Sequence, residues 1–116
     1  SSINRFSRDR RLLNAADFKA VFTKPFKSSD KNFTVLACKS SKDKARLGLA
    51  ISKKNTRLAV DRNRLKRLIR ESFRKNQLSL AGLDMVVMAR HQTFKQSNQA
   101  LFDSLQVHWN RIKQKA

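Results

Sequence analysis

Apolar residues recur every three or four positions near both ends of this chain, and at every second position in its middle. The first pattern predicts a short helix over residues 15–24, with Asn14 suited to its N-cap and Pro25 placed to end it. Ser97 stands where a last helix would be capped. The apolar positions of the two expected helices are Phe18, Val21 and Phe22, and then Leu101, Phe102, Leu105, Trp109 and Ile112.

Three stretches between these helices have the pattern of strands. "NFTVLACK", residues 32–39, is apolar on both faces, which is typical of a covered strand. "LDMVVMAR", residues 83–90, is an apolar run too short for a core helix, so we expect a buried strand. In "RLGLAISKK", residues 46–54, the bulky face is Leu47, Leu49 and Ile51, and the nearly bare face is Gly48, Ala50 and Ser52. A bare strand face indicates close approach of a ligand or another backbone, and tight helix packing explains it equally well.

One further helical segment, "VDRNRLKRLIRESFRKN" at residues 60–76, separates apolar from cationic positions. Its apolar sector is Leu58, Leu65, Leu68, Ile69 and Phe73, and Asn63 flanks that sector together with a cation stripe of Lys66, Arg67, Arg70 and Arg74. Like charges four residues apart, such as Lys66 and Arg70, each destabilise a helix by about 0.3 kcal/mol. Glu71 alone opposes them locally. A stripe that costs stability is best explained by a polyanion that it binds.

The order of these elements is helix, two or three strands, basic helix, strand, helix. This order predicts an α+β fold in which one sheet packs against helices and the basic helix connects two strands. The length of 116 residues suits one domain, residues 1–116. Residues 1–12 mix charge with Ser and Asn without a period, so we expect a basic N-terminal arm there.

The net charge of the chain indicates which classes of partner it binds. Twenty-seven Lys and Arg residues against 8 acids give a formal charge of +19, which favours nucleic acid first and an anionic membrane surface second. A hydrophobic content of 40% argues for a folded domain over a disordered basic tail. Neither a signal peptide nor an apolar run of about 18 residues is evident, so we expect a cytoplasmic protein without a membrane partner.

Few residues are suited to catalysis. Cys38 is the only cysteine and has no metal-ligating neighbours, so we expect a small buried strand residue. His91 and His108 have no evident Ser or carboxylate partner in the sequence, and the acids are scattered. We therefore expect no catalytic residue in the polypeptide, and the sequence leaves any metal ligand unknown.

The type of partner can be narrowed further from the basic helix. A helix-turn-helix module would place another short helix before it, whereas strand-like sequence precedes it, so DNA is not expected. A membrane-surface helix would expose large apolar residues, whereas this apolar sector has the size of a core face. RNA is the best remaining partner, because guanidinium groups bind phosphate oxygens in pairs.

The long motif "RLGLAISKKNTRLAVDRNRLKRLIRESFR" resembles the protein subunit of bacterial ribonuclease P. The similarity extends from "RRLLNAADFKAVF" to the last helix and includes the Arg62-Asn63-Arg64 triplet and "DMVVMAR". The resemblance implies an αβββαβα fold with a single four-stranded sheet, like the second domain of a small-subunit ribosomal protein. It also implies a left-handed crossover through the basic helix, against the usual rule.

The resemblance further implies a function as subunit of an endoribonuclease whose catalytic component is an RNA. That RNA, with bound Mg²⁺, removes the 5′ leader from precursor tRNA, and the protein binds both RNAs. The positions implied to bind the catalytic RNA are Lys53, Lys54, Arg62, Asn63, Arg64, Lys66, Arg67, Arg70 and Arg74. The positions implied to form a leader-binding cleft between the first helix and the sheet are Phe18, Phe22, Thr34, Leu36, Gly48, Ala50 and Ser52.

Two other functions remain open at this point. A small basic ribosomal protein would stabilise folded ribosomal RNA without a role in catalysis, and its composition would be the same. A DNA-binding regulator would form dimers and prefer a duplex sequence. Only the long motif separates these functions from the first. Two roles also remain open for Phe18 and Phe22, which could belong to the hydrophobic core or line the leader-binding cleft.

Overall fold

The computed structural model describes residues 15–23 and 25–116, in which the expected order of elements is confirmed. Asn14 and the arm expected at residues 1–12 lie outside the described residues. The helices are α1 (Ala15–Thr23), α2 (Ala59–Asn76) and α3 (Asn98–Lys115), and a 3-10 turn, η3 (Thr93–Lys95), precedes α3. The strands are β1 (Phe26–Ser29), β2 (Phe33–Lys39), β3 (Arg46–Ala50) and β4 (Leu83–Ala89).

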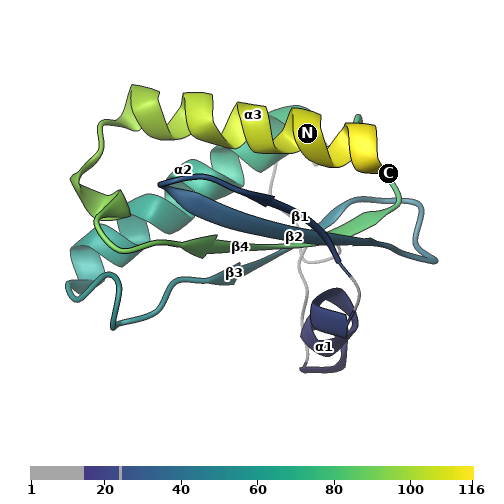
Figure 1. Ribbon diagram of the computed structural model, residues 1–116, viewed down its shortest axis with the longest axis horizontal. Coiled ribbons are helices and arrows are strands. Elements are labelled where there is room, and N and C mark those ends of the chain that lie inside the picture. Colours follow the sequence, from purple (N-terminus) through teal and green to yellow (C-terminus); the bar gives the residue numbers. More distant parts are fainter. Residues whose placement is uncertain (1–14, 24) are drawn as a thin grey trace, which may run out of the picture.

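The four strands form one mixed sheet in the order β1-β2-β4-β3 (Figure 1). β2 pairs antiparallel with β1 and with β4, with Val35 opposite Val87 in the second pair. β3 pairs parallel with β4, with Leu49 opposite Val87. Parallel neighbours need a long crossover, and α2 supplies it, so the basic helix is attached to the sheet at both ends.

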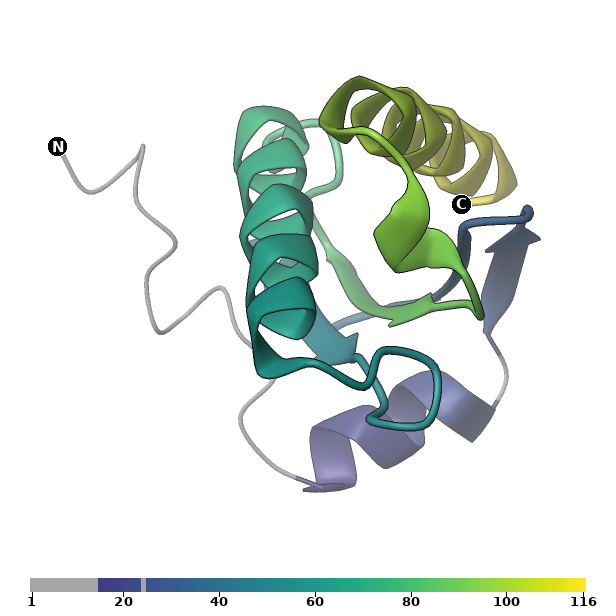
Figure 2. The ribbon, with the colours of Figure 1, turned by 90° about the vertical axis from the view of Figure 1, so that its left-hand side faces the viewer.

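The helices form layers on the two faces of the sheet. α2 and α3 cover one face and α1 lies against the other (Figures 1 and 2). The main core lies under α2 and α3, because the apolar sides of both helices meet one face of the strands. Its largest fully buried side chains include Trp109, Phe33, Phe73, Leu65, Ile69 and Met85. The Trp109 indole donates a 2.8 Å hydrogen bond to Ser72, which explains the one buried hydroxyl on the apolar side of α2.

The face beside α1 has a much smaller apolar cluster. Val21 of α1 packs there against Leu36 and Val86, and the partly buried side chains around them are Phe18, Cys38, Ala50 and Met88. The alternation of β3 is confirmed, because Leu47 and Leu49 belong to the main core while Ala50 belongs to this second cluster.

Three details differ from the sequence-based expectations. Leu58 is 60% exposed and is the residue before α2, because the helix begins at Ala59 and the loop carries Leu58 away from the core. β3 ends at Ala50, so Ser52 lies in the following loop. Cys38 is only partly buried, because it lies near the end of β2 at the border of the small cluster.

The expected N-cap of α3 is confirmed, since the Ser97 hydroxyl accepts a 3.2 Å hydrogen bond from the Ala100 amide.

Candidate nucleic-acid interface

The cation stripe lies along α2 on the side away from the core. Arg67 and the neighbouring Asn63 are exposed, while Lys66, Arg70 and Arg74 are partly covered along their stems. Arg74 forms a two-point ion pair with Glu71, with N–O distances of 2.5 and 3.0 Å, and this hydrogen bonding lowers the pKa of Glu71. The C-terminal end of the stripe is therefore partly neutralised, and its cationic character is greatest towards Lys66 and Arg67.

The two arginines of the Arg-Asn-Arg triplet bind the protein's own backbone. Arg62 Nη1 donates to the carbonyls of Thr56 and Arg57, at 2.9 and 2.7 Å. Arg64 donates to the Phe94 and Gln96 carbonyls and to the Asn98 side chain, at 3.1, 2.6 and 2.9 Å. Both arginines were expected to contact RNA, and the sequence pattern gave no sign of these bonds because Arg64 and its partners lie 30 to 34 positions apart.

Lys53 and Lys54 are exposed on the loop between β3 and α2. The loop has a defined path because Asn55 forms hydrogen bonds through both its backbone amide and its side chain. Its amide donates to Ser52 Oγ and its side chain donates to the Ala89 carbonyl of β4, both at 3.1 Å. The two lysines thus lie in the loop that leads into α2, which begins at Ala59.

The residues expected to bind a leader lie on or near the sheet face beside α1. Phe18, Leu36 and Ala50 share the small cluster, and Thr34 faces the same way as Leu36, two residues along β2. Leu36 is 7% exposed and Gly48 is buried. Both are therefore covered by neighbouring residues and support this face without being part of its surface. Phe22 is 47% exposed, and Ser52 is exposed.

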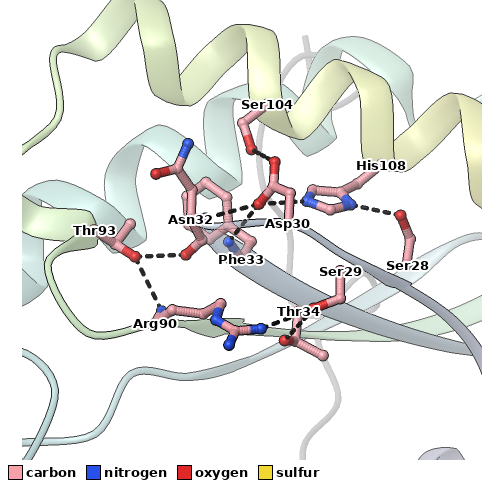
Figure 3. Close-up of polar contacts among 10 residues, drawn as sticks. All are labelled: Ser28, Ser29, Asp30, Asn32, Phe33, Thr34, Arg90, Thr93, Ser104 and His108. Atoms are coloured by element: carbon pink, nitrogen blue, oxygen red, sulfur yellow. Dashed lines mark hydrogen bonds and ion pairs between the residues drawn. The ribbon is translucent and has the colours of Figure 1, made fainter.

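Arg90 also lies in this region, although it was not among the leader-binding residues expected from the sequence. It is exposed and follows Met88 of the small cluster by two residues, so the strand alternation was a signal that could have identified it. Its guanidinium donates to Ser29 at 3.0 Å, and the Ser29 hydroxyl lies 3.1 Å from that of Thr34 (Figure 3). A cation and two hydroxyls thus border the expected leader residues.

A polar network holds α1 against the sheet. Arg46 of β3 donates two bonds to Asp84 of β4, at 2.7 and 2.8 Å, and reaches Asp17 of α1 at 3.4 Å. Hydrogen bonding to Asp84 raises the pKa of the Arg46 guanidinium, despite the opposing effect of its burial. The position of α1 therefore depends on an ion-pair network as well as on its small apolar contact.

His108 has both a serine and a carboxylate as neighbours, contrary to the expectation from the sequence. Its Nδ1 lies 2.6 Å from Ser28 Oγ, and its Nε2 lies 3.1 Å from Asp30 Oδ1 without the alignment of a full hydrogen bond (Figure 3). Ser28 is 3% exposed and His108 is fully buried, so no substrate can reach the serine. The group joins α3 to the β1–β2 turn and has a structural role.

The pKa values of this buried group are shifted. Burial lowers the pKa of His108, and the nearby Asp30 only partly opposes this effect. Burial also acts to raise the pKa of Asp30, but hydrogen bonds from the Ser104 hydroxyl and from the Phe33 and Asn32 amides outweigh it and lower the pKa to about 2. At neutral pH the pair is an ionised carboxylate beside a neutral imidazole.

Two further properties bear on partners. Across residues 15–23 and 25–116, His, Cys, Asp and Glu side chains do not gather in groups of three or more that would suit a metal ion. In the same part of the chain, no helix has the length and apolar character needed to cross a membrane.

Known proteins with similar sequences and structures share one description. The sequence profile of the family described as "Ribonuclease P" matches residues 6–113. The chain is 50% identical over 108 residues to the ribonuclease P protein component of Pseudomonas entomophila, an alignment that covers 92% of this chain and 81% of that protein. It is 51% identical over 108 residues to that of Pseudomonas aeruginosa, covering 92% and 80%.

Two solved structures extend this similarity to the fold. The RNase P protein of Staphylococcus aureus matches with a TM-score of 0.80 at 29% identity, over 89% of this chain and 96% of that one. The RNase P protein of Thermotoga maritima matches with a TM-score of 0.75 at 30% identity, over 90% and 96%.

Proposed function

This chain belongs to the ribonuclease P protein family, and we propose that it binds a catalytic RNA and helps that RNA to remove the 5′ leader from precursor tRNA. The observation that carries the proposal is the charge separation on α2. Arg67 projects from the side of the helix opposite the buried Leu65 and Ile69, and Lys66 flanks that buried side. The described acid beside them, Glu71, is bonded to Arg74. Such a stripe is suited to RNA phosphates.

The sheet face beside α1 is the second contact in this proposal. Phe22 offers an exposed ring on which a base of a single-stranded leader can stack. Arg90, with Ser29 and Thr34 beside it, offers hydrogen-bond donors for phosphate and ribose. α2 and this face would thus bind the catalytic RNA and the substrate leader respectively, and the polypeptide would act by positioning the two RNAs.

The Mg²⁺ of the reaction would be bound mainly by the RNA. Across the described residues, His, Cys, Asp and Glu side chains do not gather in groups of three or more, which supports assigning the ion to the RNA. The protein's contribution would be its cationic surface, which lowers the repulsion between two RNA molecules. A subunit that acts on newly transcribed tRNA would work in the cytoplasm.

Reconstitution tests the proposal. The purified chain is mixed with a ribonuclease P RNA and a precursor tRNA at low Mg²⁺, and cleavage at the mature 5′ end is followed on a gel. We expect cleavage that requires both chain and RNA, no cleavage by the chain alone, and a smaller effect of the protein as Mg²⁺ rises. A chain that leaves cleavage unchanged at every Mg²⁺ concentration would be a binder of other RNA, such as a structural ribosomal protein.

The leader contact is tested separately. Phe22→Ala should weaken binding of precursor tRNA to the complex by about five- to tenfold, about 1 to 1.4 kcal/mol of lost stacking, and should leave mature tRNA unaffected. Val107→Ala is the matched control, because Val107 is an apolar residue of similar exposure, 44%, on α3. Equal losses for precursor and mature tRNA would contradict a leader contact at Phe22.

Phe18→Ala tests the same face. It should lower the free energy of unfolding more than Phe22→Ala does, because Phe18 is partly buried.

A further inference from the structure

A pocket lies where the β3–α2 loop and the first turn of α2 meet the segment before α3. Its volume is about 320 Å³, at the lower end of the range of ligand sites, which suits a single nucleotide. The loop and helix side is lined by Lys54, Arg57, Leu58 and Asp61, and the opposite side by Phe94 and Lys95. Figure 2 shows these segments, teal and green, facing each other at the near end of α2.

The walls of this pocket are fixed by the Arg-Asn-Arg triplet. Arg62 holds the loop wall through the carbonyls of Thr56 and Arg57, and Arg64 holds the opposite wall through those of Phe94 and Gln96. Two guanidinium groups from one turn of helix therefore set the distance between two segments that are far apart in the sequence. A pocket whose walls are held in this way is formed before any ligand arrives, which lowers the entropic cost of binding.

The backbone at the rim supports the same conclusion. Gln92 lines the pocket and has a φ of 77°, in the left-handed region that residues other than glycine rarely adopt. This turn directs the chain into η3 and brings Phe94 to the wall. Strained residues persist where surrounding contacts hold them, and they gather at ligand sites.

The side chains in the pocket combine three kinds of chemistry. Leu58, 60% exposed, and the partly buried Phe94 ring offer an apolar surface. Lys54, Arg57 and Lys95 are exposed cations, and the Lys95 ammonium lies 5.9 Å from the centre of the Phe94 ring. Asp61 is the only acid among the lining residues. A free phosphate would need neither the apolar surface nor the acid, and an apolar peptide would not need three cations.

We propose that this pocket binds one unstacked nucleotide of an RNA, with its base against Leu58 and Phe94 and its phosphate held by Lys54, Arg57 and Lys95. Asp61 then selects a base that presents N–H donors. Guanine fits best, because its ring N–H and its amino group are adjacent and match the two oxygens of a carboxylate. The inference rests on the proposed function, since it is the RNA bound along α2 that would supply this nucleotide.

Mononucleotides test the pocket with the full chain. The ¹⁵N-labelled protein is titrated with GMP, UMP, ribose 5-phosphate and inorganic phosphate, and amide shifts are followed by NMR. We expect saturable shifts at His91, Gln92 and Phe94 with GMP, with binding about tenfold tighter than that of ribose 5-phosphate or UMP. Equal affinity for GMP and ribose 5-phosphate would overturn the proposal in favour of an anion site, and no saturable shift at these amides would overturn it altogether.

Variants test the roles of individual residues. Leu58→Ser should weaken GMP binding about fivefold, whereas Val60→Ser should not change it, because Val60 is 70% exposed and is not among the lining residues. Asp61→Asn should remove most of the preference for GMP over UMP, and it should not weaken ribose 5-phosphate binding, because it removes a negative charge beside the phosphate-binding cations. Loss of binding with Val60→Ser, or an unchanged preference with Asp61→Asn, would contradict the assignment.

The same variants separate this inference from the proposed function. In the complex with a ribonuclease P RNA, Leu58→Ser should lower affinity with an unchanged salt dependence, because no cation is removed. A chain that activates the RNA but shows no GMP shifts would refute the pocket and leave the function standing. A chain that binds GMP at these amides but does not activate the RNA would refute the function.

Discussion

The two faces of the sheet are built differently. The face under α2 and α3 holds a continuous core with Phe73 and Trp109 at its centre, edge to face at 6.2 Å between ring centres. Among the described residues, the apolar cluster of the face beside α1 has Val21, Leu36 and Val86 as its buried members, and Arg46 with its carboxylate partners also holds the helix. The first face maintains the fold, and the second retains exposed apolar and polar side chains that can meet a ligand.

This difference would allow a small domain to carry the two proposed RNA contacts without losing its core. The cation stripe runs along α2 beside the apolar sector, and its exposed member Arg67 points away from the core. The expected leader residues lie on the sheet face that is only thinly covered. Each proposed binding surface thus uses side chains that the main core does not need, and substitutions should separate binding from folding.

The largest expected effect comes from the core. Phe73→Ala should lower the free energy of unfolding by about 3 to 5 kcal/mol, because it removes a fully buried ring between α2 and α3. Phe22→Ala, on the other face, should cost less than about 1 kcal/mol, because that ring is already 47% exposed. Urea unfolding followed by circular dichroism measures both. Similar losses for the two variants would break the comparison.

The next effect concerns the polar network beside α1. Asp84→Asn should lower the free energy of unfolding by about 2 kcal/mol, because the buried carboxylate accepts two charged hydrogen bonds from Arg46. Hydrogen exchange should speed up in α1 and remain slow in α3. The exposed Asp103, changed to Asn, is the control and should shift stability by less than about 0.5 kcal/mol. Equal acceleration in both helices would mean that α1 is not held independently.

Acid should weaken the other side of the molecule. Burial lowers the pKa of His108 in the folded protein below its ordinary value of 6.5. Below pH 6.5 the unfolded chain therefore binds the proton more readily than the folded protein, and the free energy of unfolding decreases as the pH is lowered. This loss can reach about 1.4 kcal/mol per pH unit for one proton. The contribution of Asp30 has the usual carboxylate sign, being present above pH 3.8 and lost as the pH falls towards about 2.

Urea unfolding at pH 7.5 and 5.5 measures the histidine effect. His108→Gln should be less stable at pH 7.5 and should show a smaller change between the two pH values. His91→Gln, at an exposed position, should behave like the unchanged protein. A pH dependence that survives in the His108 variant would place the sensitive group elsewhere.

The smallest expected effect on the fold comes from the cation stripe. Arg67→Ala should change the free energy of unfolding by less than about 0.5 kcal/mol, because Arg67 is exposed. It should nevertheless flatten the salt dependence of RNA binding by about one unit of log-log slope, because one phosphate contact is lost. Asn63→Ala should weaken binding with little change in slope, because a neutral side chain displaces no counterions. A stripe variant that unfolds the protein without altering the salt slope would assign the stripe to the fold.

The local elements and the separation of charged from apolar positions along them could be predicted from residue spacing. A helix places residues three and four apart on one side and a strand places every second residue on one face, so the core side of α2 and the two faces of β3 followed from spacing alone. Family membership followed from the long motif around Arg62-Asn63-Arg64. Leu58 was misplaced because a periodic pattern does not show at which residue a helix begins.

Contacts between distant residues, in contrast, came from the folded arrangement of the chain. The bonds from Arg64 to Phe94 and Gln96, the contact of His108 with Ser28 and Asp30, and the pocket between the α2 loop and η3 all join segments that are far apart in the sequence. Local periodicity carries no information on such contacts, because they depend on how the sheet orders its strands and where each connection returns. The direction in which Arg62 and Arg64 point was therefore decided by the fold, although their presence on a basic helix was evident from the sequence.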